Sequence, residues 1–173
     1  MTDTRVKFQP IWDNHPDIKD HDHNPCKNDA GDPAFGNECS IRLSIAFKRA
    51  GINVPATKAT PHCWFKGHVQ HVLQAEALAG WILLQKAKFG KVDKKVGKEW
   101  NAKDGVSVDY YKGKKGIIFF KDFWRRELAG GKMESLENQT GDHIEAWDGQ
   151  NQAAGSHDDY FVRSKQLWFW ELP

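Results

Sequence analysis

Two residues that can together cleave an amide bond stand far apart in this sequence, a cysteine at position 39 and a histidine at position 143. Cys39 follows the polar, glycine-containing segment 35–38 and opens a run with helical periodicity, which predicts that it lies at a helix N-terminus. There the unpaired backbone N–H groups and the helix dipole favour the thiolate and lower the pKa of the thiol. A buried cysteine that packs as a small hydrophobic side chain is the alternative for Cys39 taken alone.

His143 opens a segment, 143–147, that has the character of a strand running into an Asp-Gly turn. A cysteine at a helix start followed by a histidine on a later strand is the order of a papain-like pair. This order predicts acyl transfer, in which His143 takes the Cys39 proton or already holds it in an ion pair, and the thiolate attacks a carbonyl. The Cys39 N–H then binds the oxyanion, and His143 protonates the leaving amine. A structural strand histidine is the alternative for His143 alone.

The helices that must position this pair can be read from hydrophobic periodicity in the first half of the chain. Residues 39–50 are predicted to form a helix with apolar side chains on shared faces, and Gly51 ends it. Residues 67–87 are predicted to form a second, well-buried helix. The N-terminal segment 1–34 is expected to be irregular, apart from a short helix around residues 8–12.

The second half of the chain has the pattern of a sheet. The all-apolar run Ile117–Phe120 fits a strand that is covered on both faces, and the segment from His143 is the next strand. A short helix is expected over 157–165, and the segment 167–172 alternates as a closing strand. Helices followed by an antiparallel sheet predict an α+β fold, a papain-like core in which the helix that carries Cys39 packs on the sheet.

Length and composition indicate one globular domain over residues 1–173. The net charge of +2 gives no broad basic surface, which argues against nucleic acid as a partner. The first five residues lack the apolar core of a signal peptide, and no segment is long enough to span a membrane. We therefore expect no membrane insertion, and either a cytoplasmic protein or one exported without a cleaved signal.

Four segments carry a resemblance to a known family. They are Asn37–Ser44 around the cysteine, Gly116–Phe120, Gly141–Gly149 around the histidine, and Leu167–Pro173. In this order they resemble the fourth family of type VI secretion amidase effectors, which are papain-like cell-wall peptidases that bacteria inject into rivals. The resemblance runs from about Phe35 to the C-terminus, and the cysteine and histidine segments are its specific parts.

The resemblance implies a secreted antibacterial toxin, delivered by the type VI secretion apparatus, that acts in the periplasm of a target Gram-negative cell. It implies as substrate the peptide stem of peptidoglycan, cut at the γ-D-glutamyl–meso-diaminopimelate amide. We expect no cofactor. A cell that makes such an enzyme is exposed to it from its kin. We therefore expect a cognate immunity protein that covers the Cys39–His143 site, with Trp64 or Trp147 as apolar contacts.

A third polar group should orient the His143 ring. In the resembling family this group is an aspartate after the histidine strand, but the spacing here differs, and the matching position falls near Ala154. The candidates are Asp158, Asp148 and Asn151. We prefer Asp158, because the strand that returns after the turn could bring the next helix start beside His143. A carboxylate in a first helical turn also stabilises the helix, which is the structural explanation of Asp158.

The other two cysteines, Cys26 and Cys63, accompany histidines of the kind that bind zinc. These are His21, His23, His62 and His68. Their spacing matches no familiar zinc pattern, so we predict a solvated loop that binds no metal. We place His68 and His71 at the polar edge of the helix predicted over residues 67–87. Cys26 and Cys63 are either two free thiols or one disulfide, which an oxidising periplasm permits.

Two other functions compete with a cell-wall amidase. One is a different papain-like hydrolase, such as a transglutaminase-like or deamidating toxin. The other is a non-catalytic domain that binds carbohydrate or protein through its eight tryptophans, with a structural Cys39. Fast alkylation of Cys39 at neutral pH is expected of a catalytic cysteine and not of a buried structural one.

Overall fold

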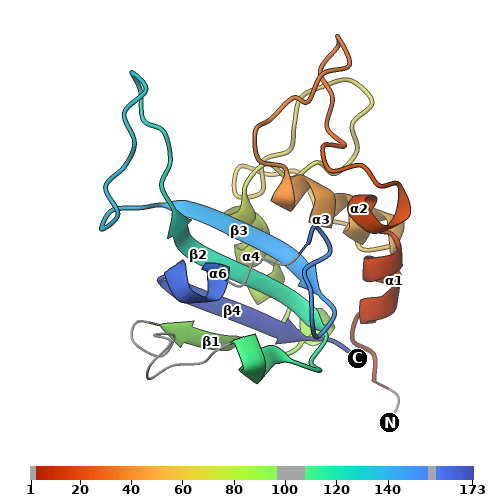
Figure 1. The fold of residues 1–173 in the computed structure, drawn as a ribbon. Helices are drawn as coiled ribbons and strands as arrows, with labels where there is room; N and C mark the ends of the chain where they lie inside the picture. Colours follow the sequence, from red (N-terminus) through yellow and green to blue (C-terminus); the bar gives the residue numbers. More distant parts are fainter. Residues whose placement is uncertain (1–2, 97–107, 156–158) are drawn as a thin grey trace.

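The computed structural model describes residues 3–96, 108–155 and 159–173. Its elements are α1 (Phe8–Asp13), α2 (Pro16–Lys19), α3 (Cys39–Arg49), α4 (Ala75–Leu84), α5 (Lys86–Phe89), β1 (Asp93–Val96), the 3₁₀ helix η2 (Val108–Tyr111), β2 (Gly116–Trp124), β3 (Gly141–Trp147), α6 (Asp159–Arg163) and β4 (Gln166–Glu171). Helices come first and an antiparallel sheet follows, so the predicted α+β layout is confirmed (Figure 1). None of the helices in these ranges has the length and apolar character that crossing a membrane requires.

The sheet places the histidine strand at its edge. Within the described residues it has four strands in the order β1-β4-β2-β3, and neighbouring strands are antiparallel. Phe120 of β2 is paired with His143 on one side and with Leu167 on the other. The outer side of β3 faces α3, with α1 and α2 beyond it (Figure 1). Helix and histidine strand are therefore direct neighbours.

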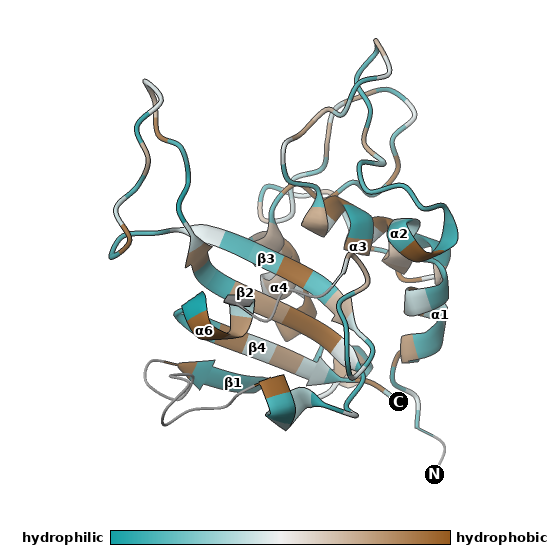
Figure 2. Ribbon diagram, viewed as in Figure 1, coloured by the Kyte–Doolittle hydropathy of each residue, from teal (hydrophilic) through white to brown (hydrophobic). Residues whose placement is uncertain are grey.

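The core lies on both faces of the sheet because the β2 side chains alternate between them. Ile117 and Phe119 pack with α3 and α4 on one face. Ile118 and Phe120 pack on the other face with aromatic side chains of η2 and α6, among them Tyr111 and Phe161. The prediction of a strand covered on both faces is thus confirmed, and its apolar residues run through the middle of the sheet in Figure 2.

Helix α3 begins at Cys39, as predicted, and its end follows from a glycine. Gly51 has φ +80°, a conformation that favours glycine, and the N–H of Ile52 donates to the carbonyl oxygen of Phe47 over 2.8 Å. At the other end, the buried Glu38 carboxylate accepts a hydrogen bond of 2.8 Å from the N–H of Cys26. This contact attaches the loop after residue 25 to the start of the helix that carries Cys39.

The predicted helix over 67–87 is wrong in its first part, since α4 starts only at Ala75. Residues 61–73 instead fold back on themselves, and the N–H of Cys63 donates to the His71 oxygen over 2.9 Å. Gly67 and Gln70 have positive φ, which a helix excludes. The Gln70 amide donates to the Ser44 and Ile52 oxygens over 2.9 Å each, so long-range contacts override the local helical pattern. His68 and His71 therefore lie in this folded-back segment and not on a helix.

Candidate active site

Cys39 is the first residue of α3, and its thiol is almost fully enclosed. The residue is 3% exposed and lines a cavity of about 340 Å³ together with Leu73 and Asp142. The backbone N–H groups of Ile144 and Ser40 lie near the sulfur and lower the pKa of the thiol, which favours the thiolate. Ile144 directly follows His143 in β3, so the thiol lies against the backbone of the histidine strand.

The pKa of Cys39 moves in the opposite direction from the prediction. Burial, which penalises the charged form, raises the pKa of the thiol to about 11, and the N–H of Ile144 and the charge of Arg42 offset this only in part. Desolvation therefore raises the pKa of the Cys39 thiol by more than the helix N-terminus lowers it. A neutral thiol in the free protein favours proton transfer to a base during attack over a preformed thiolate–imidazolium pair.

The N–H of Cys39, which the sequence assigned to the oxyanion, has a partner in this structure. It donates a hydrogen bond of 3.1 Å to Oδ1 of Asn37. This contact is an Asx turn that closes the start of the helix. An oxyanion would have to replace the Asn37 oxygen to use this donor.

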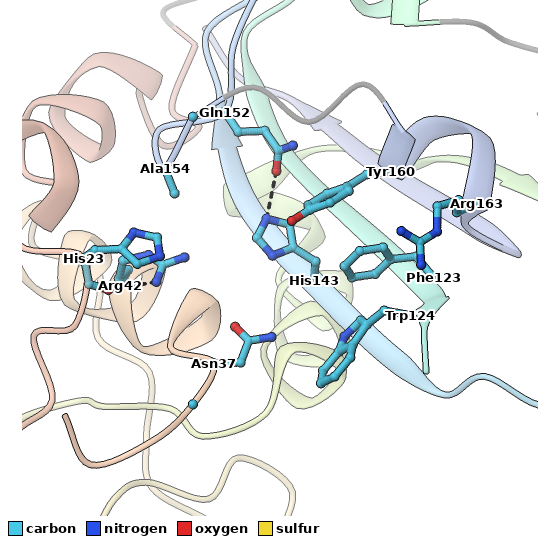
Figure 3. A pocket seen from close by; sticks show the side chains of 12 residues that line it. His23, Asn37, Arg42, Phe123, Trp124, His143, Gln152, Ala154, Tyr160 and Arg163 are labelled. Atoms are coloured by element: carbon cyan, nitrogen blue, oxygen red, sulfur yellow. Dashed lines mark hydrogen bonds between the residues drawn. The ribbon is translucent and has the colours of Figure 1, made fainter. Parts of the chain in front are cut away.

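His143 is the third residue of β3, not its first, and it is oriented by a residue that the sequence analysis missed. Its Nε2 lies 2.8 Å from Oε1 of Gln152, and both residues are buried. Aromatic rings surround the imidazole, with the Tyr160 and Phe123 centroids at 5.0 and 6.0 Å. Figure 3 shows the imidazole held between these rings and the Gln152 amide, with Asn37 facing it across the cavity. This cavity has a volume of about 370 Å³.

The cavities of Cys39 and His143 are neighbours. Asn37 and Trp124 contribute to the walls of both, so the cavities lined by the two candidate residues adjoin each other. The structure thus brings the predicted pair to the same region from positions more than a hundred residues apart in the chain.

Two of the three candidates for the residue that orients His143 lie in the turn after β3. Asp148 is in the turn after β3, where its Oδ1 accepts hydrogen bonds of 2.7 Å from the N–H groups of Gln150 and Asn151. The carbonyl oxygen of Asn151 accepts from the N–H of Asp148 over 3.1 Å, which closes the same turn. Asp158 lies outside the described residues. Gln152 follows this turn directly, and its amide oxygen takes the place at the His143 ring that was expected of an aspartate or asparagine.

A buried charge cluster lies behind the pair. Glu145 of β3 is fully buried, and its Oε1 is 2.8 Å from Nε2 of His15. Arg42 of α3 approaches both Glu145 and Asp17, at 3.7 and 3.0 Å. Burial alone would raise the pKa of Glu145, but the charges of His15 and Arg42 lower it. The cluster joins α3 to the strand that carries His143.

The expectation of a solvated loop around Cys26 is wrong, because both cysteines lie in the interior. Cys26 and Cys63 are buried with free thiols, and they gather with His68 and His71 as a group of metal-ligand types. His21, His23 and His62 are not members of this group. The Nδ1 atom of His23 instead lies 2.8 Å from the Asp17 carboxylate.

Comparison with known proteins gives one family and several structures. The family model of type VI secretion system amidase effector protein 4, Tae4, matches residues 35–170. The structure of Tae4 from Enterobacter cloacae is similar with a TM-score of 0.66 and 18% identity over 100% of both chains. Tae4 in the Tae4–Tai4 effector–immunity complex from the same organism gives 0.61 and 17%, over 98% of this chain and 99% of that one. The effector–immunity complex from Salmonella Typhimurium gives 0.57 and 16%, with the same coverage.

The structural similarity to these Tae4 proteins confirms the predicted papain-like fold. No curated protein matches the chain.

Proposed function

The chain belongs to the Tae4 family of type VI secretion amidase effectors, as its motifs predicted, and we propose that it hydrolyses an amide bond through Cys39 and His143. The observation that carries this proposal is the placement of the Cys39 thiol against the backbone of Ile144, next to His143, at neighbouring cavities with shared walls. A nucleophile and a base from different elements that meet at a cavity are the arrangement that acyl transfer requires.

The hydrogen bond to Gln152 assigns the roles of the two imidazole nitrogens. An amide oxygen only accepts, so Nε2 of His143 carries the hydrogen and donates it to Oε1 of Gln152. Nδ1 is then the basic nitrogen, which takes the Cys39 proton as the sulfur attacks the carbonyl carbon. The protonated imidazole returns this proton to the leaving amine, and a water molecule hydrolyses the thioester.

The tetrahedral intermediate needs a donor for its negative oxygen. We assign this role to the N–H of Cys39, which in the free protein donates to Asn37. The incoming carbonyl oxygen replaces the Asn37 oxygen as the transition state forms. Asn37 lines both cavities, so its side chain can turn towards the substrate when it is displaced.

Membership of the family supports a proposal for the substrate, the compartment and the partner. The substrate is the peptide stem of peptidoglycan, cut between γ-D-glutamate and meso-diaminopimelate, in the periplasm of a target Gram-negative cell. The Tae4 proteins from Enterobacter cloacae and Salmonella Typhimurium form complexes with the immunity protein Tai4. We accordingly propose that a cognate immunity protein binds this chain too.

Digestion of purified sacculi tests the proposal. The wild type should release fragments whose masses identify the cut amide, whereas Cys39→Ala and His143→Ala should release none while they keep the wild-type circular dichroism spectrum. Because the two residues act as a unit, the double variant should be scarcely less active than either single one. Release of ammonia without cleavage would indicate a deamidase, and binding without reaction would indicate a carbohydrate-binding domain.

A further inference from the structure

Two cysteines and two histidines from separate loops converge on one point away from the candidate active site. Their ligand atoms, from Cys26, Cys63, His68 and His71, all lie within 4.8 Å of one another. The two sulfur atoms are 3.7 Å apart, and Nδ1 of His68 is 3.3 Å from one and 3.1 Å from the other. The ring centroids of His68 and His71 are 4.4 Å apart, and the two ring planes are tilted by 32°.

The distances fit the edges of a metal-centred tetrahedron. A zinc–sulfur bond of about 2.3 Å places two thiolates at tetrahedral corners about 3.8 Å apart. The observed 3.7 Å between the Cys26 and Cys63 sulfurs is close to this separation. It is also far longer than the bond of about 2.05 Å in a disulfide.

Backbone hydrogen bonds hold the ligands in place. The folded-back segment 61–73 pairs the Cys63 N–H with the His71 oxygen over 2.9 Å, which sets these two ligands side by side. The N–H of Ala34 closes the other loop by donating to the Cys26 oxygen over 2.8 Å. The two loops, orange and yellow in Figure 1, protrude together beyond α3.

The four side chains lie in apolar surroundings, and at least one of the histidine ring nitrogens among them needs a binding partner. Cys26 and Cys63 form a cluster with Ile41 and Ile45 of α3. His71 is 8% exposed, and among the described residues its Nδ1 atom has no hydrogen-bond partner. Burying polar nitrogens and two thiols in such a place costs free energy unless something binds them.

We propose that Cys26, Cys63, His68 and His71 bind one zinc ion as a structural site. Two thiolates and two imidazoles in a tetrahedral arrangement are a donor set that favours zinc. All four positions are filled by the protein, so the ion has no open position for water and takes no part in the hydrolysis.

The ion would connect the two loops that flank the start of α3. Cys26 donates its N–H to Glu38, the residue before Cys39, and Leu73 at the end of the other loop lines the Cys39 cavity. Zinc bound by the two loops therefore holds the wall of the Cys39 cavity in place from outside the candidate active site. The sequence pattern, Cys26 followed by Cys63-x₄-His68-x₂-His71, is unlike the familiar zinc motifs, which is why spacing alone did not reveal it.

Metal content and cobalt substitution test the site directly. Protein purified without chelators should carry about one zinc per chain by elemental mass spectrometry. Reduced apoprotein titrated with Co²⁺ should show the intense d–d bands of tetrahedral coordination and a thiolate charge-transfer band, and it should saturate at about one Co²⁺ per chain. Cys63→Ser and His71→Ala should each abolish these bands.

Two variants serve as matched controls. His62→Ala removes a histidine of the same folded-back segment that lies outside the cluster, and Cys39→Ser removes the third cysteine. Both should keep the full metal content. Loss of the cobalt bands in Cys39→Ser would overturn the proposal, because the metal would then be bound at the candidate active site.

Thiol protection in the wild type avoids any dependence on variants that fail to fold. Bound zinc should protect Cys26 and Cys63 from alkylation, as mapped by peptide mass spectrometry, and a chelator should remove this protection. A reduced protein that takes up neither Zn²⁺ nor Co²⁺ would overturn the site. So would a Cys26–Cys63 disulfide whose reduction yields no cobalt spectrum.

Discussion

Arg42 lies 3.7 Å from Glu145, with Nη2 facing Oε2, and this contact joins the helix that starts with Cys39 to the strand that carries His143. Arg42 is three residues after Cys39, on the same side of the helix, and Glu145 is two residues after His143 in β3. Asp17 and His15 complete the cluster from the N-terminal segment. The spacing of nucleophile and base therefore depends on a buried ion pair behind them.

Glu145→Gln should destabilise the protein by about 3 kcal/mol, because it removes one of the two carboxylates, Glu145 and Asp17, that face the buried Arg42 and His15. Urea denaturation at pH 7 measures this loss. Asp20→Asn is the matched control, since it breaks the ion pair of Asp20 with Arg49, in which both side chains are more than one third exposed. That variant should stay within about 1 kcal/mol of wild type. Equal effects of the two variants would contradict a role for the buried cluster.

The same carboxylate should make stability fall in acid. The opposing effects of burial and of the charges of His15 and Arg42 leave the pKa of Glu145 lowered from 4.5 to about 2. Because the folded-state pKa lies below the unfolded one, this stabilisation is complete above pH 4.5 and is lost as the pH falls towards about 2. The wild type should accordingly lose stability faster than Glu145→Gln across this window. Parallel curves of unfolding free energy against pH would exclude the coupling.

Gln152→Ala should lower turnover by about 10- to 100-fold, because the His143 ring loses the acceptor that fixes its orientation and tautomer. Gln152→Glu should keep the acceptor and add a negative charge, which raises the pKa of His143. The acid limb of the pH–rate profile, where His143 must be neutral, should then move to higher pH. A purely structural role would change stability without this movement.

Gln150→Ala is the control for these variants, because Gln150 is an exposed glutamine of the same turn. Its turnover should equal that of the wild type. Asp158→Asn tests the residue preferred from the sequence, which stays a prediction. If Asp158→Asn lowers turnover and Gln152→Ala does not, Asp158 and not Gln152 orients His143.

Asn37→Asp should lower turnover by about a hundredfold with little effect on stability. A carboxylate at this position binds the Cys39 N–H more strongly than the amide does and repels the developing oxyanion. Asn28→Asp is the matched control, since the Asn28 side chain closes a similar Asx turn by accepting from the N–H groups of Ala30 and Asp32, each over 3.0 Å. A normal rate for Asn37→Asp would mean that the oxyanion does not use the Cys39 N–H.

The sequence predicted those features that depend on local pattern. A polar loop, a helical period and Gly51 together placed Cys39 at the start of α3, and the apolar run of β2 predicted burial on both faces. Contacts between distant segments were not predictable in the same way. The turn after β3 brings Gln152 to His143, and no period or propensity marks that residue.

Three further errors have the same physical cause. The segment before Ala75 has helical periodicity, yet hydrogen bonds from Gln70 to α3 and to Ile52 hold it folded back. The helix N-terminus does favour a thiolate at Cys39, but the burial created by the whole fold dominates its pKa. Trp147, expected to contact a partner, is 1% exposed and donates from Nε1 to the Tyr111 oxygen, so it belongs to the core.

Secretion of this chain into a bacterial periplasm should lyse the cell, whereas cytoplasmic expression should be tolerated, because the proposed substrate lies outside the inner membrane. Periplasmic Cys39→Ala should be harmless. Survival of cells that contain folded wild type with reduced Cys39 in the periplasm would mean that peptidoglycan is not the substrate. A co-expressed immunity protein should restore growth to cells that secrete the wild type.

The immunity protein should bind across the cavities of Cys39 and His143, where Trp124 forms part of both walls. Trp124→Ala should weaken the complex by about 2 kcal/mol, or roughly thirtyfold in Kd, because a rigid aromatic contact at the centre of an interface is lost. Trp64 is 73% exposed and lines neither cavity, so Trp64→Ala should change Kd little. Bound partner should also slow alkylation of Cys39 at alkaline pH, where the thiol ionises. Full reactivity of Cys39 in a neutralised complex would exclude direct occlusion and require inhibition from a remote surface.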